Sequence, residues 1–132
     1  MAKLTAQGEN HLLNTYLARV ARGTLYLGLY TDAAEPGETA LLSTITELPV
    51  ANGYARIAIA NGDVTVVGSL ATIAQKTFTA SGGIWAGVTG WFLTNIASGT
   101  YAPLICVESF SDGARTILDG LTLQISPTFT AS

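Results

Sequence analysis

Apolar and polar residues alternate in short stretches along most of this chain, and turn-forming residues separate the stretches about every 8 to 12 positions. In residues 24–31, for example, Leu25, Leu27 and Leu29 lie on one face of an extended chain, while two tyrosines and a glycine lie on the other. A period of two is typical of a β-strand with one buried face. Repetition of this pattern predicts a mainly β fold, an antiparallel β-sandwich or jelly-roll-like barrel, with one N-terminal α-helix.

Two turn sequences predict hairpins between neighbouring strands. Asn61-Gly62 is a common choice for a two-residue turn, so the stretches on either side of it are expected to pair. Ser111-Asp112-Gly113 predicts a second turn, after which residues 115–118 pair back on the preceding strand. The stretch 84–93 is apolar on both faces, which predicts a central strand or one beneath the helix. Strands are expected over residues 24–31, 54–60, 64–68, 73–79, 84–93, 104–110, 115–118 and 121–125.

A single amphipathic helix is predicted ahead of the strands. Leu12, Tyr16 and Val20 recur at helical spacing, and Gly23 can adopt the left-handed conformation that ends a helix. A chain of 132 residues is long enough for one core and shows no linker, so we expect a single domain, 1–132. Its expected parts are a helical arm at 1–22, a β core at 24–126 and a C-terminal tail at 127–132 that becomes ordered on contact with a neighbour.

The composition predicts a neutral surface. Hydrophobic residues make up 48% of the chain and charged residues 11%, against a usual charged share of about 25%. Small residues such as Thr, Ala and Gly must therefore cover much of the exterior, and a weakly charged surface is suited to burial against other proteins. The net charge is -3 with only six Lys plus Arg, so we expect no binding to nucleic acid, which needs clustered cations.

The longest uncharged stretch, residues 77–107, is long enough to span a bilayer. Its glycines, its Pro103 and its alternation favour buried strands, so no membrane association is expected. Cys106 is the only cysteine, which excludes a disulfide within one chain and argues against a structural zinc site. Because no basic and then apolar segment opens the sequence, synthesis and folding in a cytoplasm are expected.

Residues that could support catalysis are few. His11 is the only histidine and lies on the polar side of the predicted helix, and Cys106 lies within a strand with no cation beside it to lower its pKa. Asp112 and Asp119 precede glycines in turns, where they bond to local backbone. We therefore expect no enzymatic activity, no catalytic residues, no metal and no cofactor.

Two features leave alternatives open. Glu108 lies inside an apolar strand, where it either pairs with Arg56 or Arg115 across the sheet or faces a contact between subunits. A group of aromatic residues is expected to pack in the core or at an interface, with a sugar-binding platform as the alternative. The group comprises Tyr26, Tyr30, Tyr54, Trp85 and Trp91.

The order of short motifs resembles a family of small bacteriophage virion proteins, described as head, decoration or tail-fibre-like proteins. The resemblance runs through most of the chain. Its parts are an N-terminal helix, residues 24–31 (TLYLGLYT), an acidic Pro/Gly loop, residues 52–56 (NGYAR), residues 77–79 (TFT), residues 85–91 (WAGVTGW), an apolar strand near Leu104, and residues 116–120 (TILDG) before alternating Leu and Ile.

The resemblance implies a capsid decoration (cement) protein that occurs in many copies on the virion, is assembled in the host cytoplasm and binds the major capsid protein. A homo-oligomer is expected. The first alternative is a tail, collar or fibre-attachment component that binds other virion proteins, and the second is a carbohydrate-binding module. Contacts with partners are expected from the N-terminal helix, the acidic loop and the tail, because such segments fold over neighbours. The candidate contact residues are Leu12, Tyr16, Arg19, Glu35, Glu38 and Phe129.

Overall fold

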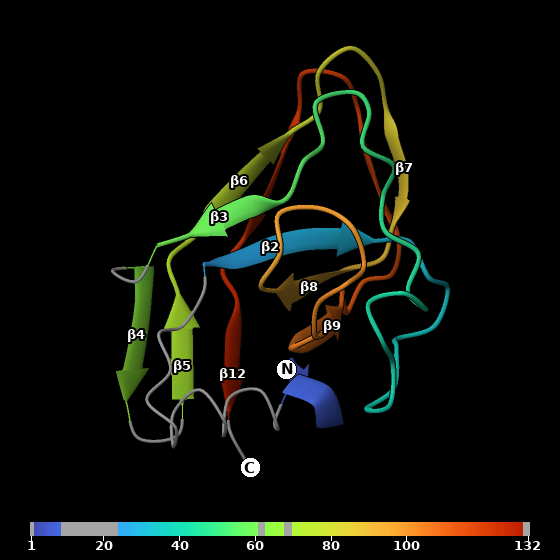
Figure 1. Cartoon of the computed structure of the whole chain (residues 1–132). Coiled ribbons are helices and arrows are strands. Elements are labelled where there is room, and N and C mark those ends of the chain that lie inside the picture. Colours follow the sequence, from blue (N-terminus) through green and yellow to red (C-terminus); the bar gives the residue numbers. More distant parts are fainter. Residues whose placement is uncertain (1, 9–23, 61–62, 68–69, 131–132) are drawn as a thin grey trace.

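A computed structural model describes residues 2–8, 24–60, 63–67 and 70–130 (Figure 1). These residues form antiparallel sheets in a β-sandwich-like fold, with a short helix that begins at Ala6, so the predicted fold class is confirmed. The strands are β1 (Lys3–Leu4), β2 (Leu25–Tyr30), β3 (Ile57–Ile59), β4 (Val64–Val67), β5 (Leu70–Ile73), β6 (Lys76–Thr79), β7 (Trp85–Val88), β8 (Gly90–Thr94), β9 (Cys106–Ser109), β10 (Arg115–Ile117), β11 (Thr122–Ile125) and β12 (Thr128–Thr130).

The largest sheet has the strand order β1-β9-β8-β2-β3, with every neighbouring pair antiparallel. The smaller sheets are β12-β5-β4 and the two pairs β10-β7 and β11-β6. Leu27 of β2 and Leu93 of β8 share one core with Ile73, Trp85 and Leu123 of the smaller sheets. The main core therefore lies between the largest sheet and the smaller ones, as expected for a sandwich.

A second apolar cluster covers the opposite face of the largest sheet. Tyr30, Phe92 and Val107 extend from that face and pack with Leu42 and Leu104, which belong to the connections before β3 and β9. The strand β8 is thus buried on both faces, which confirms the central strand predicted within residues 84–93. Because loops supply this cover, their conformation depends on the apolar side chains beneath them.

The hairpin predicted at Asn61-Gly62 is wrong. The strand β3 pairs with β2, and β4 pairs instead with β5, so that Val67 lies opposite Leu70. A turn is present where the chain leaves β3, because the backbone N–H of Asp63 donates to the Ala60 carbonyl. The two strands diverge because the backbone of β3 completes the largest sheet and buries Ile59, a tertiary contact that outweighs the local turn preference.

The second predicted hairpin is also wrong. The chain turns at Gly113, whose φ is +87°, but β10 then pairs with β7 rather than β9. This pairing places Ile117 opposite Trp85, and both side chains are buried in the main core. Two predicted strands are also divided: residues 73–79 contribute to β5 and β6, and residues 84–93 to β7 and β8, with each half in a different sheet.

Both ends of the described chain join sheets. Near the N-terminus, β1 pairs with β9, and the hydroxyl of Thr5 then caps the helix by accepting a hydrogen bond from the backbone N–H of Gly8 at 2.9 Å. Near the C-terminus, β12 pairs with β5, which sets Phe129 opposite Ala71. Residues 128–130 of the tail that was predicted to become ordered on a neighbour are therefore paired within their own chain, where they extend the edge of the sheet that contains β5.

A glycine in the largest sheet makes room for an aromatic ring. Gly28 lies opposite Phe92 in the β2–β8 register, and a Cβ at Gly28 would lie 2.3 Å from the ring of that buried phenylalanine. We expect Gly28→Ala to destabilise the protein by about 1–3 kcal/mol, since the ring must move within a packed core. Urea unfolding measures this change. Gly37→Ala is the matched control, because its Cβ meets no atom within 4 Å; an equal loss in the control would contradict the steric explanation.

Candidate functional site

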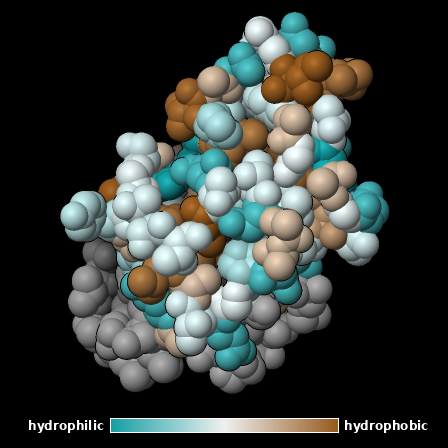
Figure 2. Space-filling view, turned by 90° about the vertical axis from the view of Figure 1, so that its right-hand side faces the viewer, coloured by the Kyte–Doolittle hydropathy of each residue, from teal (hydrophilic) through white to brown (hydrophobic). Residues whose placement is uncertain are grey.

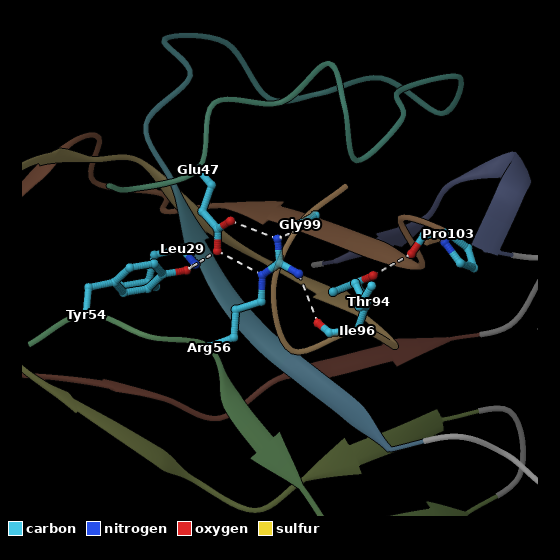
Figure 3. Close-up of polar contacts among 8 residues, drawn as sticks. All are labelled: Leu29, Glu47, Tyr54, Arg56, Thr94, Ile96, Gly99 and Pro103. Atoms are coloured by element: carbon cyan, nitrogen blue, oxygen red, sulfur yellow. Dashed lines mark hydrogen bonds and ion pairs between the residues drawn. The ribbon is translucent and has the colours of Figure 1, made fainter. Parts of the chain in front are cut away.

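A buried ion pair is the centre of the polar contacts in Figure 3. The Arg56 side chain is only 3% exposed, and its partner Glu47 is 24% exposed. Arg56 Nε donates to Glu47 Oε2 at 2.9 Å, and Nη2 donates to Oε1 at 2.8 Å. Two parallel charge-assisted hydrogen bonds fix the guanidinium in one orientation. The guanidinium also lies over the Phe92 ring, 5.3 Å from its centroid, above the second apolar cluster.

The same guanidinium holds the loop of residues 95–103. Its Nη1 donates to the Ile96 carbonyl and its Nη2 to the Gly99 carbonyl, both at 2.9 Å. Beyond these, the Thr94 hydroxyl donates to the Pro103 carbonyl at 2.8 Å, as Figure 3 shows. Three carbonyls along the loop are therefore bound by two side chains, that of Arg56 just before the edge strand β3 and that of Thr94 in the central strand β8, which gives the loop a defined conformation.

Tyr54 completes the network on the side of β2. Its hydroxyl donates to Glu47 Oε2 at 2.6 Å and accepts from the backbone N–H of Leu29 at 3.0 Å. Burial, and then the hydrogen bond to Glu47, raise the pKa of Tyr54 well above its usual range, so the hydroxyl keeps its proton and remains a donor. Among the described residues, no buried side-chain nitrogen or oxygen lacks a hydrogen-bond partner.

An open cleft of about 370 Å³ lies beside the loop that Arg56 holds. Its inner side includes the buried Leu42, which belongs to the second apolar cluster. Tyr101 stands at its rim with 98% of its surface exposed. The lining consists of Gln7, residues 41–43 and residues 100–103. An exposed aromatic side chain on a held loop, next to a hollow with apolar lining residues, is a feature of protein interfaces.

Two hydrogen bonds join the elements around this cleft. The N–H of Ala6 donates to the Glu38 carbonyl at 2.8 Å, and the side chain of Gln7 accepts from the N–H of Leu104 at 2.8 Å. The start of the helix, the acidic loop and the loop of residues 95–103 thus meet at one place. We call the surface formed by Gln7, residues 41–43 and residues 100–103 the Tyr101 cleft.

No model of a known protein family matches this chain. A search of curated proteins also finds no significant relative.

The three predicted contact residues that the structure describes lie in different parts of the fold. Glu38 lies beside the Tyr101 cleft through its bond to Ala6, whereas the carboxylate of Glu35 accepts a hydrogen bond from the N–H of Ser109 in β9. Phe129 is in β12, in a different sheet. Leu12, Tyr16 and Arg19 lie outside the described residues.

The residues considered for chemistry have structural roles where the structure describes them. Cys106 is fully buried in the main core, and burial, with the charges of Glu108 and Glu35, raises the pKa of its thiol to about 12. Asp119 accepts a hydrogen bond from the N–H of Gly82, and Asp112 pairs with Arg115 at 3.2 Å. Within the described ranges, no three His, Cys, Asp or Glu residues are grouped to hold a metal, and no helix is both long and apolar enough to cross a membrane. His11 lies outside those ranges.

Of the two alternatives left open for Glu108, pairing with Arg56 or Arg115 is not supported, because each of these arginines pairs with another carboxylate. Arg56 pairs with Glu47, and Arg115 pairs with Asp112 and lies 4.2 Å from the centroid of the Phe110 ring. Both arginines find a carboxylate nearby in the sequence, nine and three residues away, so their pairing closes short loops.

The aromatic residues do not form a sugar-binding platform. Trp85, Trp91, Tyr54 and Tyr30 are at most 3% exposed, and only Tyr26 of that group is partly exposed. The indole N–H of Trp85 donates to the Asn52 carbonyl at 2.9 Å, which satisfies its one polar group inside the core. The alternative of packing in the core, also considered from the sequence, is confirmed for these four residues.

Sequence reasoning missed both Tyr101 and the loop that carries it. The available signal was weak: Tyr101 lies between Gly99 and Pro103, which mark a loop but not its exposure. Arg56 also offered a signal, since an arginine near apolar strand residues requires a partner when it is buried. Its partners at Ile96 and Gly99 follow 40 and 43 residues later, beyond any local pattern.

Proposed function

We propose that this chain is a non-enzymatic structural protein of a bacteriophage virion, a capsid decoration protein that binds the major capsid protein and stabilises the head. The observation that carries the proposal is Tyr101, 98% exposed at the rim of a cleft that Leu41 and Leu42 also line, on a loop bound to the buried Arg56. Binding surfaces use such residues because a tyrosine supplies a large contact area with little side-chain entropy to lose.

The loop that carries Tyr101 is already held in one conformation before a partner binds. Arg56 and Thr94 hold the carbonyls of Ile96, Gly99 and Pro103. A partner that covers Tyr101 therefore loses less free energy to ordering the loop than it would with a free segment. A preformed surface is suited to a protein that adds to a lattice in many copies, where several modest contacts act together.

The low charge of the chain and the virion-like order of its motifs support the more specific assignment. With 11% charged residues, the exterior has few hydrated groups to strip on contact with a protein shell. The resemblance of residues 24–31, 52–56 and 85–91 to small phage virion proteins points to a capsid as that shell.

Substitution of Tyr101 by alanine tests this role directly. Purified heads that lack the chain are titrated with labelled protein and sedimented, and we expect Tyr101→Ala to weaken binding by about 2 kcal/mol, roughly 30-fold. Thr116→Ala, at an exposed position in β10, is the matched control and is expected to bind like the wild type. Equal thermal midpoints establish that both variants are folded. Wild-type binding by a folded Tyr101→Ala variant would contradict the assignment of this surface.

A tail, collar or fibre-attachment role is the alternative, because the virion family that the chain resembles includes tail-fibre-like proteins as well as head and decoration proteins. Purified tails titrated in parallel distinguish the two locations. We expect saturable binding to heads and none to tails. Binding to tails alone would replace the decoration role with the tail role, while the importance of Tyr101 could still be tested on the new partner.

A further inference from the structure

A second exposed apolar surface lies at the end of the molecule drawn uppermost in Figure 1, where three connections meet. These connections are residues 48–54, residues 80–84 between β6 and β7, and residues 118–121 between β10 and β11. Figure 2 shows hydrophobic residues gathered at the same end. Four large side chains there are at least half exposed: Val50 at 75%, Ile84 at 54%, Leu118 at 51% and Leu121 at 53%. We call these four residues the tip patch.

Hydrogen bonds hold the three connections against one another. The N–H of Ser81 donates to the Asn52 carbonyl at 2.9 Å, and the N–H of Ala80 donates to the Leu121 carbonyl at 3.0 Å. The N–H of Gly120 returns a bond to the Ala80 carbonyl at 2.8 Å. The exposed apolar side chains therefore stand on a fixed frame and remain exposed instead of folding inward.

The pairing of β7 with β10 places two members of the patch on one face. Ile117 lies opposite Trp85 and both are buried, so the adjoining Ile84 and Leu118 emerge together on the outer face. Leu121 is joined to Leu118 by the turn in which its N–H donates to the Leu118 carbonyl at 2.9 Å. Ile84, Leu118 and Leu121 thus lie together around this turn, and Val50 belongs to the connection that the hydrogen bond between Ser81 and Asn52 joins to them.

The size of the tip patch is that of a weak contact. Four side chains with half or more of their area exposed present on the order of 400 Å², within the range of roughly 300–600 Å² for the largest apolar patch of a monomer, which is often functional. A stable two-body interface needs about 800 Å² from each partner. A single tip contact is therefore expected to be concentration-dependent.

The lack of charge on the tip patch favours a second copy of this chain as its partner. The three connections contain one charged residue, Asp119, and its carboxylate already accepts a hydrogen bond from the N–H of Gly82 at 2.9 Å. In a two-fold contact each group faces its own kind, so an uncharged apolar patch meets no like charge on a second copy and is complementary to itself.

We propose that the tip patch binds the tip patch of a second copy of this chain in a weak two-fold contact. This contact uses none of the residues of the Tyr101 cleft, so one copy can engage a shell and a neighbouring copy at the same time. The proposal does not depend on the virion assignment, since it concerns the purified chain alone.

Sedimentation velocity of the full chain between roughly 10 µM and 1 mM tests the proposal. We expect the wild type to sediment faster as concentration rises, and Leu118→Glu to weaken self-association at least tenfold because it brings carboxylates together on an apolar surface. Leu41→Glu is the matched control: Leu41 is similarly exposed, at 45%, but it lines the Tyr101 cleft. The control is expected to associate like the wild type, and circular dichroism establishes that each variant is folded.

Mixing opposite charges identifies the second copy as the occupant. An equimolar mixture of Leu118→Glu and Leu118→Lys chains is expected to associate more tightly than either variant alone, which a loss of folding cannot produce. A wild type that stays monomeric over the whole range would overturn the proposal. So would association that survives Leu118→Glu, or that is lost equally in Leu41→Glu.

Discussion

Replacing Glu47 by leucine is expected to destabilise the protein by about 3–5 kcal/mol, because it leaves a buried cation without its anion. Arg56 is 3% exposed, so water cannot solvate its charge where it lies, and the two backbone carbonyls that it also contacts carry no net charge. Tyr54 would lose the acceptor of its 2.6 Å hydrogen bond at the same time. Urea unfolding followed by circular dichroism measures the loss.

A double-mutant cycle separates the ion pair from the packing. We expect the Glu47→Leu and Arg56→Met double variant to be more stable than Glu47→Leu alone, since it removes the stranded charge. Asp112→Asn is the surface control: it removes the charge from the exposed pair with Arg115 and is expected to cost less than about 1 kcal/mol. A Glu47→Leu variant as stable as that control would show that the guanidinium finds other solvation, and that the network does not hold the loop.

Removal of the Trp85 indole has the other large expected effect, a loss of about 3–5 kcal/mol for Trp85→Ala. The ring is 2% exposed and makes edge contacts with Tyr54 and Phe78, at centroid distances of 5.9 and 6.5 Å. The same substitution removes one of the two hydrogen bonds that the Asn52 carbonyl accepts at the base of the tip patch, and the bond from the N–H of Ser81 remains.

Trp85→Phe distinguishes packing from hydrogen bonding. We expect this variant to lose roughly 1–3 kcal/mol, because it keeps an aromatic ring and forfeits the bond to Asn52. The free energies of unfolding of both variants and of the wild type are measured by urea unfolding under the same conditions. A Trp85→Ala variant of wild-type stability would mean that Trp85 is not a core residue, and would reopen the sugar-binding alternative that its burial argues against.

Local patterns in the sequence predicted the strands that have one apolar face. The alternation of Leu25, Leu27 and Leu29 identified β2, and the alternation of Leu123 and Ile125 identified β11, because burial on one side imposes a period of two. Apolar residues on both faces of β8 likewise predicted its central position. The burial of each face of a strand shows in the order of apolar and polar residues along that strand, so a short stretch of sequence is enough to predict it.

Strand pairing could not be predicted in the same way. Asp63 and Gly113 lie at turns as expected, but the strands after these turns join other sheets, where their side chains fill the main core. Arg56 belongs to the same class of feature, since its bonds to Ile96 and Gly99 join segments far apart in the sequence. Strand pairing and the bonds of Arg56 both depend on which surfaces the rest of the chain leaves uncovered. A short stretch of sequence does not contain that information.

The Tyr101 cleft and the tip patch together suit a protein that contacts two kinds of neighbour. One surface presents a single exposed tyrosine beside a hollow, and the other consists of four exposed aliphatic side chains. Each is small compared with a stable two-body interface of about 800 Å² per partner. Contacts of this size become strong when geometry allows many of them to form at once, as on a regular shell.

Electron cryomicroscopy of the purified virus particle that carries this chain tests the central claim most directly, because it locates each copy and its contacts. The account predicts copies across the capsid lattice, each with Tyr101 against the major capsid protein. A particle without the chain, or copies confined to a tail or a single vertex with Tyr101 facing solvent, would contradict it.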